Sequence, residues 1–185
     1  MAKQFPRRTL FLSFLSAALL FIVSGYLLSD AFFFKRLVYQ NDITSPEEAF
    51  AFVVSNTGIP DLRSPPPLEY SPRLMLTKQK NLFCDQSVIL MATVVGELGY
   101  DTRLVDWVGD DGISHHTTLE VKQGEGWKAY DTLNRRQGET YEQIKRGLTF
   151  NARPAYREYI GSRWINRNNY YLQQLSLWLR RARGG

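Results

Sequence analysis

The sequence predicts an α+β domain in which one helix packs on an antiparallel sheet, preceded by a single membrane-spanning helix. The sheet is predicted because three strand-like segments, 103–108, 116–122 and 127–130, are separated only by short turn-like stretches. The helix is predicted from an apolar, helix-like pattern over residues 82–98. It ends at Gly99, and glycine is favoured just after the last turn of a helix.

The membrane-spanning helix is predicted at residues 9–29, which carry no charged side chain. With a rise of about 1.5 Å per residue, such a helix would be roughly 31 Å long and could cross the bilayer core. A cleaved signal peptide is the alternative, but its apolar core is usually shorter and ends at a site of small residues. Basic residues before the span favour a single-pass protein of a bacterial-type inner (plasma) membrane. The domain would then face the periplasm or the outside.

The helix that opens the globular domain has strong start signals. Ser45 can cap it, Pro46 suits its first turn, and Glu48 completes a capping box. A proline-rich loop over residues 60–72 and a short helix over 141–146 are also predicted. The chain thus divides into five segments. Residues 1–8 form a cytoplasmic N-terminus, 9–29 the anchor and 30–44 an aromatic and basic juxtamembrane collar. Residues 45–161 form a globular domain, and 162–185 a C-terminal basic amphipathic helix. The last helix could pack on the domain or lie on the membrane.

The charge of the chain is unevenly distributed. Residues 37–152 carry eleven Lys and Arg against sixteen Asp and Glu, whereas residues 1–36 and 153–185 are both basic. Basic ends suit contact with anionic membrane lipid and with membrane proteins. No nucleic-acid partner is expected, because no nucleic-acid-binding module is recognisable. The acidic centre favours a basic or neutral substrate.

Cys84 is the only cysteine of the chain, so it cannot form an internal disulfide. It lies at the start of the predicted helix, where the helix dipole favours a thiolate. His115, His116 and Asp131 follow on neighbouring predicted strands, whose side chains can meet. A thiol, an imidazole and a carboxylate in this order are the parts of a Cys-His-Asp hydrolase or acyltransferase. The spacing does not suit a closed zinc site, and neither a metal nor a cofactor is expected.

The flanks of these residues form a longer pattern. Cys84 opens a helix, His116 comes four residues before Glu120, and Trp127 comes four residues before Asp131. Together with the stretch between them, this pattern resembles the transglutaminase-like (papain-like) cysteine enzyme superfamily. The resemblance implies a papain-like core that acts on a protein or peptide-like amide, by hydrolysis or by acyl transfer.

The same resemblance implies a catalytic triad of Cys84, His116 and Asp131. His116 is chosen for its spacing to the residues that follow, and His115 is the alternative. The backbone N–H of Cys84 would help to stabilise an oxyanion, with Gln79 or Asn81 as further candidate donors.

Two hypotheses compete with a membrane-anchored enzyme. The first is an inactive transglutaminase-like subunit that serves as an interaction module in a membrane complex, which the small size and the basic, aromatic ends would suit. The second is a lipid-surface binding protein, which rests on the arginines and tryptophans of the C-terminal segment. If the chain is an enzyme, hydrolysis is slightly favoured over transfer, since water needs no second binding site.

Overall fold

The structure, a computed structural model of the 185-residue chain, describes two continuous stretches and four isolated positions, namely residues 30–61, 71–157, 16, 18, 19 and 21. Residues 30–40 are helical. The helices that follow are α2 (Pro46–Asn56), α3 (Pro72–Leu74), the π-helical turn η1 (Met75–Gln79), α4 (Cys84–Leu98) and α5 (Tyr141–Arg146). The strands are β1 (Thr102–Val108), β2 (Ser114–Gln123), β3 (Gly126–Asp131), β4 (Arg136–Glu139) and β5 (Arg153–Arg157).

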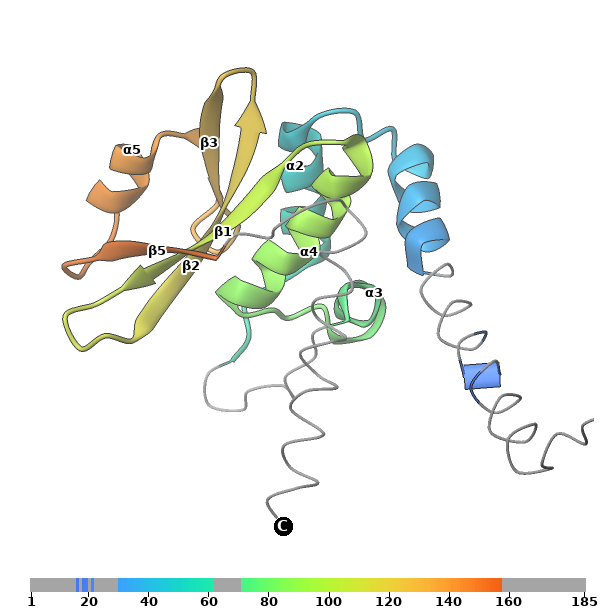
Figure 1. Cartoon of the computed structure of the whole chain (residues 1–185), viewed down its shortest axis with the longest axis horizontal. Coiled ribbons are helices and arrows are strands. Elements are labelled where there is room, and N and C mark those ends of the chain that lie inside the picture. The colour runs from blue at the N-terminus through green and yellow to red at the C-terminus, as the bar shows by residue number, and fades with distance from the viewer. Residues whose placement is uncertain (1–15, 17, 20, 22–29, 62–70, 158–185) are drawn as a thin grey trace, which may run out of the picture.

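The five strands form one antiparallel sheet in the order β4-β3-β2-β1-β5, so the α+β prediction is confirmed (Figure 1). The three predicted strands are its centre, and β2 is longer than predicted at both ends. The edge strands β4 and β5 were not predicted. Helix α4 begins at Cys84, two residues later than predicted, and ends before Gly99, whose φ of 101° is favourable only for glycine.

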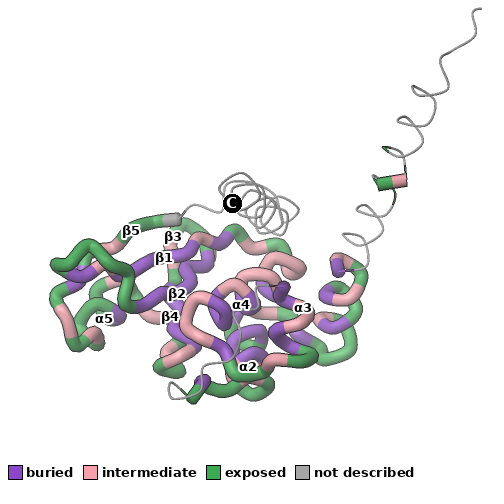
Figure 2. The backbone as a smooth tube through the Cα atoms, turned by 90° about the horizontal axis from the view of Figure 1, so that it is seen from below, coloured by how far each residue is buried: buried purple, intermediate pink, exposed green. Residues whose placement is uncertain are grey.

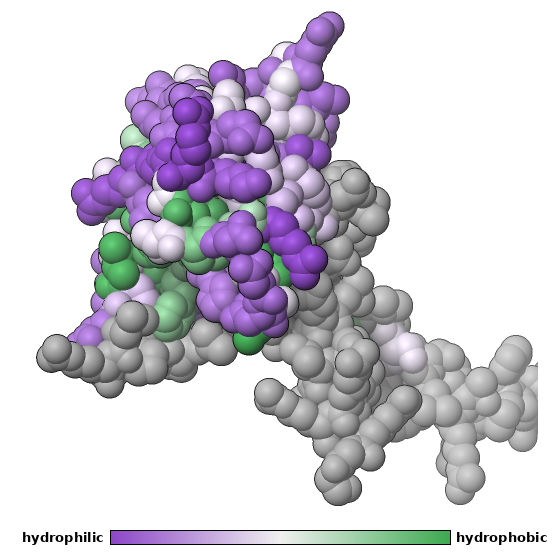
Figure 3. Space-filling view, turned by 90° about the vertical axis from the view of Figure 1, so that its left-hand side faces the viewer, coloured by the Kyte–Doolittle hydropathy of each residue, from purple (hydrophilic) through white to green (hydrophobic). Residues whose placement is uncertain are grey.

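Helices α2 and α4 cover one face of the sheet, and α5 lies on the other face (Figure 1). The larger core lies between α4 and the sheet, and it includes Val88, Leu90, Met91, Val94, Val95, Leu104, Leu119, Val121 and Tyr130. A smaller core on the α5 side holds Val105, Trp107, Ala129, Ile144 and Ala152. Buried residues therefore follow α4 and the central strands (Figure 2). From the end that carries α5 and β5, the surface is largely hydrophilic around a smaller hydrophobic area (Figure 3).

The helical segment 30–40 is part of this domain. Phe34 and Leu37 enter the larger core, whereas Phe32 and Tyr39 are exposed. The carboxylate of Asp30 pairs with Arg73 at 3.6 Å. The predicted juxtamembrane collar thus has one face packed on the domain and one face exposed.

The predicted start of α2 is confirmed. The hydroxyl of Ser45 accepts from the backbone N–H of Glu48 at 3.2 Å, and the Glu48 carboxylate accepts from the backbone N–H of Ser45 at 3.1 Å. This reciprocal pair satisfies two donors that would otherwise have no partner in the first helical turn.

The predicted anchor, most of the proline-rich loop and the C-terminal helix lie almost wholly outside the described residues. Within the described residues, none of the helices combines the length and the hydropathy needed to cross a bilayer.

Candidate active site

Cys84 is the first residue of α4 and is partly exposed. The helix can begin there because Phe83 is extended, with φ −67° and ψ 167°. The backbone N–H of Phe83 donates to the side-chain oxygen of Gln86 at 3.0 Å, which closes the first turn. Cys84 therefore lies at the positive end of the helix dipole.

His116 on β2 and Asp131 at the end of β3 are both buried, and they are hydrogen-bonded to each other. The distance from Nε2 of His116 to Oδ2 of Asp131 is 2.8 Å. The contact forms because β2 and β3 are antiparallel neighbours. With Nε2 held by the carboxylate, Nδ1 is the ring nitrogen that remains for another partner.

Cys84 also interacts with the imidazole of His116, because its hydrogen bond and its charge both contribute to the raised pKa of His116. Burial is the largest influence and lowers the pKa of His116. Hydrogen bonding to Asp131 and to Cys84, together with the charge of both groups, outweighs burial and raises the pKa to about 9. For Asp131, burial would raise the pKa, but the His116 imidazolium and the hydrogen bonds from Asn134 hold it below its ordinary value. The imidazole of His116 is thus hydrogen-bonded to Asp131, and its pKa also depends on Cys84.

His115 is directed elsewhere. Its Nε2 lies 2.8 Å from the carboxylate of Asp111, and its ring stacks edge-on against Phe150. The pairing of β1 with β2 passes from Trp107–His116 to Val108–Ser114, which leaves His115 without a partner across the ladder. Such a bulge re-aims the extra side chain, so the two adjacent histidines face different surroundings.

Asn134 is a site residue that the sequence reasoning did not find. Its backbone N–H donates to Oδ1 of Asp131 at 3.0 Å, and its side-chain amide donates to Oδ2 at 2.8 Å. An aspartate that accepts from the backbone just after it is the common signature of a turn. The spacing Asp131-x-x-Asn134 after a predicted strand could have indicated this turn.

Of the two candidate oxyanion donors outside the helix, Gln79 has its amide group engaged. Its nitrogen donates to the Asn81 carbonyl at 3.0 Å and to the Gln86 side chain at 3.2 Å. The side-chain oxygen of Asn81 lies against Gly58, so closely that a Cβ atom there would be 2.7 Å from it. The Gln79 nitrogen is therefore already hydrogen-bonded, and the Asn81 side chain packs against Gly58.

Among the described residues, no group of three or more His, Cys, Asp or Glu side chains is arranged to hold a metal ion. Thr118, which follows His116 by two residues, has a structural contact. Its hydroxyl accepts from the buried indole N–H of Trp107 at 3.0 Å.

Comparison with known proteins gives one similarity. The structure is similar to that of a solved TGase. That solved structure, described as "Crystal structure of a TGase", is 15% identical in sequence, with a TM-score of 0.43. The similarity covers 68% of this chain and 38% of that chain, so this chain spans well under half of its length. No protein-family model and no curated protein matches the chain.

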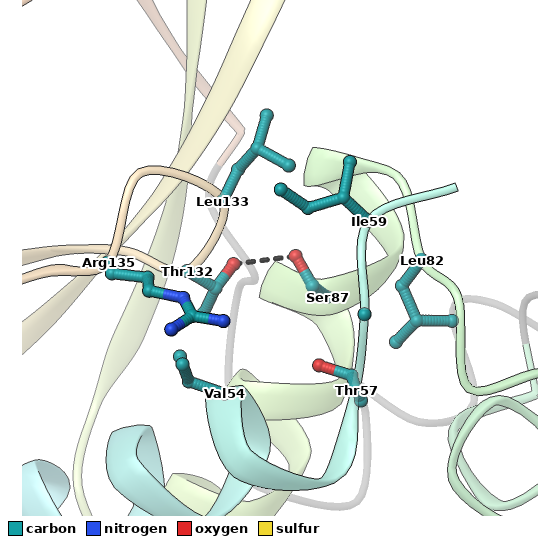
Figure 4. A pocket seen from close by; sticks show the side chains of 9 residues that line it. Val54, Thr57, Ile59, Leu82, Ser87, Thr132, Leu133 and Arg135 are labelled. Carbon is teal, nitrogen blue, oxygen red and sulfur yellow. Dashed lines mark hydrogen bonds between the residues drawn. The ribbon is translucent and has the colours of Figure 1, made fainter. Parts of the chain in front are cut away.

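A small pocket lies between α4, the C-terminal end of α2 and the turn that follows β3 (Figure 4). Ser87, one turn after Cys84, and Thr132, directly after Asp131, meet in its wall with their hydroxyl oxygens 2.6 Å apart. The hydroxyl of Ser87 also donates to the Cys84 carbonyl at 3.1 Å. These contacts join the first turn of α4 to the turn that follows β3.

Proposed function

We propose that the chain is a membrane-anchored thiol enzyme that attacks an amide bond through Cys84, His116 and Asp131. The observation that carries this proposal is the buried hydrogen bond between His116 and Asp131, with Cys84 interacting with the same imidazole. A carboxylate that holds one ring nitrogen fixes the tautomer and the orientation of the other. This support comes from the contacts themselves and does not depend on the similarity to a solved structure.

In the first half of the reaction the thiolate attacks the carbonyl carbon. Because the pKa of His116 is raised to about 9, the imidazole holds the proton at neutral pH. The sulfur forms a bond to carbon, and the backbone N–H at the start of α4 can donate to the developing oxyanion. The C–N bond then breaks as His116 gives its proton to the leaving nitrogen, and a thioester of Cys84 remains.

In the second half the neutral imidazole accepts a proton from water or from an amine. The attacking oxygen or nitrogen forms a new bond to the acyl carbon, and the C–S bond breaks. The product is an acid or a new amide, and the sulfur returns as the thiolate beside the imidazolium. We favour hydrolysis, since water needs no second binding site.

The proposed substrate is a protein or peptide-like amide close to a membrane. Support for the location comes from the uncharged run at residues 9–29 and from the basic residues before it. The domain would face the periplasm or the outside, and the basic chain ends would contact anionic lipid or membrane-protein partners.

Alkylation of Cys84 by iodoacetamide at pH 6 tests the thiolate without knowledge of the substrate. A free thiol is almost fully protonated at this pH, so we expect Cys84 in the folded chain to react at least about tenfold faster than in the unfolded chain. His116→Ala should remove this advantage, because the imidazole that keeps the proton is gone. Mass spectrometry gives the rate directly, since the chain has one cysteine.

The matched control is His115→Ala, which removes the neighbouring histidine that bonds Asp111 instead. It should leave the alkylation rate unchanged. A folded chain that reacts no faster than the unfolded one, or equal losses in both histidine variants, would contradict the enzyme proposal and favour the interaction module. Release of aniline from a peptide anilide library should then require both Cys84 and His116.

A further inference from the structure

The pocket beside Cys84 has features of a substrate subsite. Leu82 and Ser87, which contribute to its wall, lie on either side of Cys84 along the chain, and Thr132 follows Asp131. Its volume of about 30 Å³ gives room for a small polar group such as a carboxylate. The pocket wall therefore includes a residue one helical turn from Cys84, whose hydroxyl donates to the Cys84 carbonyl, and the residue directly after Asp131.

Arg135 is the only charged residue among those that line the pocket (Figure 4). Its guanidinium is turned toward Thr132 in this view. Among the ion pairs of the described residues, the adjacent Arg136 is matched with Glu139, whereas Arg135 has no carboxylate partner. Its charge is thus available to a ligand.

The backbone holds Arg135 in an unusual conformation. Its φ of 55° is in the left-handed region, which residues other than glycine seldom adopt. The turn that imposes this conformation is closed by Asn134, which donates twice to the Asp131 carboxylate. Conformations of this cost persist where the surrounding structure fixes them, often at functional sites. The carboxylate that holds His116 therefore also sets the direction from which Arg135 enters the pocket.

The rest of the pocket wall suits the stem of an acidic side chain. Apart from the arginine, the lining combines four apolar side chains with the hydroxyls of Thr57, Ser87 and Thr132, and the last two are bonded to each other. Its apolar side chains are Val54, Ile59, Leu82 and Leu133. Apolar side chains beside hydroxyls and one guanidinium fit a short methylene stem that ends in a carboxylate.

We propose that this pocket binds the carboxylate of an acidic side chain on the residue whose carbonyl Cys84 attacks, with Arg135 as the specificity-determining residue. This inference rests on the proposed function of Cys84. The acidic balance of residues 37–152 does not oppose it, because a guanidinium in direct contact outweighs charges that are distant and screened by salt.

Two peptidyl chloromethyl ketones test the inference, one with glutamate and one with glutamine next to the ketone. In each, the Cys84 sulfur displaces chloride and forms a thioether, which mass spectrometry detects. We expect the wild-type chain to react roughly fivefold faster with the glutamate probe, the scale of one partly exposed ion pair. Arg135→Gln should bring the two rates together, and Arg135→Lys should keep part of the preference.

Arg146→Gln is the matched control, since Arg146 is exposed and donates to the Glu142 carbonyl on α5. It removes the same charge away from the pocket and should keep the preference. Arg135→Asn provides a second neutral variant whose side chain tolerates the left-handed conformation. Equal rates for both probes in the wild-type chain, or a preference that survives both neutral variants, overturn the subsite alone. Failure of both probes to label folded Cys84 overturns the proposed function as well.

Discussion

The His116 imidazole lies between two groups that stabilise its charged form, and this decides its titration. Burial alone would lower the pKa, yet Asp131 and Cys84 raise it to about 9. A raised pKa in the folded state stabilises the fold fully below the ordinary histidine value near 6.5, and this contribution is lost as the pH rises through about 9. The lowered pKa of Asp131 stabilises the fold above the ordinary aspartate pKa. This contribution is lost as the pH falls through the lowered pKa of the folded state.

Asp131→Asn is expected to lower the pKa of His116, because burial is then opposed only by Cys84. The chain has two histidines, so NMR can follow both imidazole protons through a pH titration. The control is Asp111→Asn, which removes the partner of His115 and should leave His116 unchanged. A His116 signal that titrates alike in the wild-type chain and in Asp131→Asn would contradict this account of the site.

The sequence predicted a site of Cys84, one histidine and Asp131. Only the spacing of His116 to the residues that follow it favoured this histidine over the one before it. Simple strand alternation could not decide between His115 and His116, because the bulge opposite Trp107 and Val108 breaks the alternation there. Asn134 was missed because its role depends on a turn held by side-chain contacts rather than by hydrophobic pattern.

At the scale of elements, local signals predicted α2, α4 and α5, but not the helical segment 30–40, α3 or η1. Helix α2 has its N-cap, its proline and its capping glutamate within four residues, so the helix start is decided locally. The strands β4 and β5 carry no such signal. β4 has only four residues, and β5 contains Pro154 and joins the sheet beside β1 from more than forty residues away. Their pairing depends on the assembled sheet, which a local pattern does not contain.

Ser45→Ala is expected to lower the free energy of unfolding by ~1 kcal/mol, the usual cost of losing an N-cap. The loss arises because the backbone N–H of Glu48 loses its acceptor at the start of a helix that carries Phe50 and Val53 into the core. Urea unfolding followed by circular dichroism measures the change. Ser45→Asp supplies another good cap and should stay close to the wild-type value, so equal losses in both variants would show that the capping contact is not the cause.

At the scale of the whole molecule, the domain extends into the segment that precedes it. Phe34 is fully buried in the larger core, whereas Phe32 is 70% exposed, although both belong to one helical segment. The predicted anchor ends directly before this segment. If the anchor is cut off, the segment keeps its contacts with the domain, including that of Asp30 with Arg73.

A variant that starts at residue 30 should therefore leave the membrane fraction and keep the melting temperature of the domain. Within this variant, Phe34→Ala is expected to cost about 3–5 kcal/mol, because it leaves a cavity in the core. Phe32→Ala is the matched control and should change stability by less than about 0.5 kcal/mol. Cell fractionation and thermal unfolding are the measurements, and similar costs for both phenylalanines would contradict the described packing.

The Asp131 carboxylate couples the folding of the β3–β4 turn to the assembly of the candidate site. The same two oxygens close the turn after β3 and hold the imidazole of His116. If the β3–β4 turn frays, Asp131 therefore also loses its hold on the imidazole of His116, and the proposed base is no longer oriented. Under the proposed function, the thiol becomes an effective nucleophile only after β2 and β3 have paired in register. A partly folded chain would be catalytically silent, and neighbouring chains still being synthesised at the membrane would be safe from it.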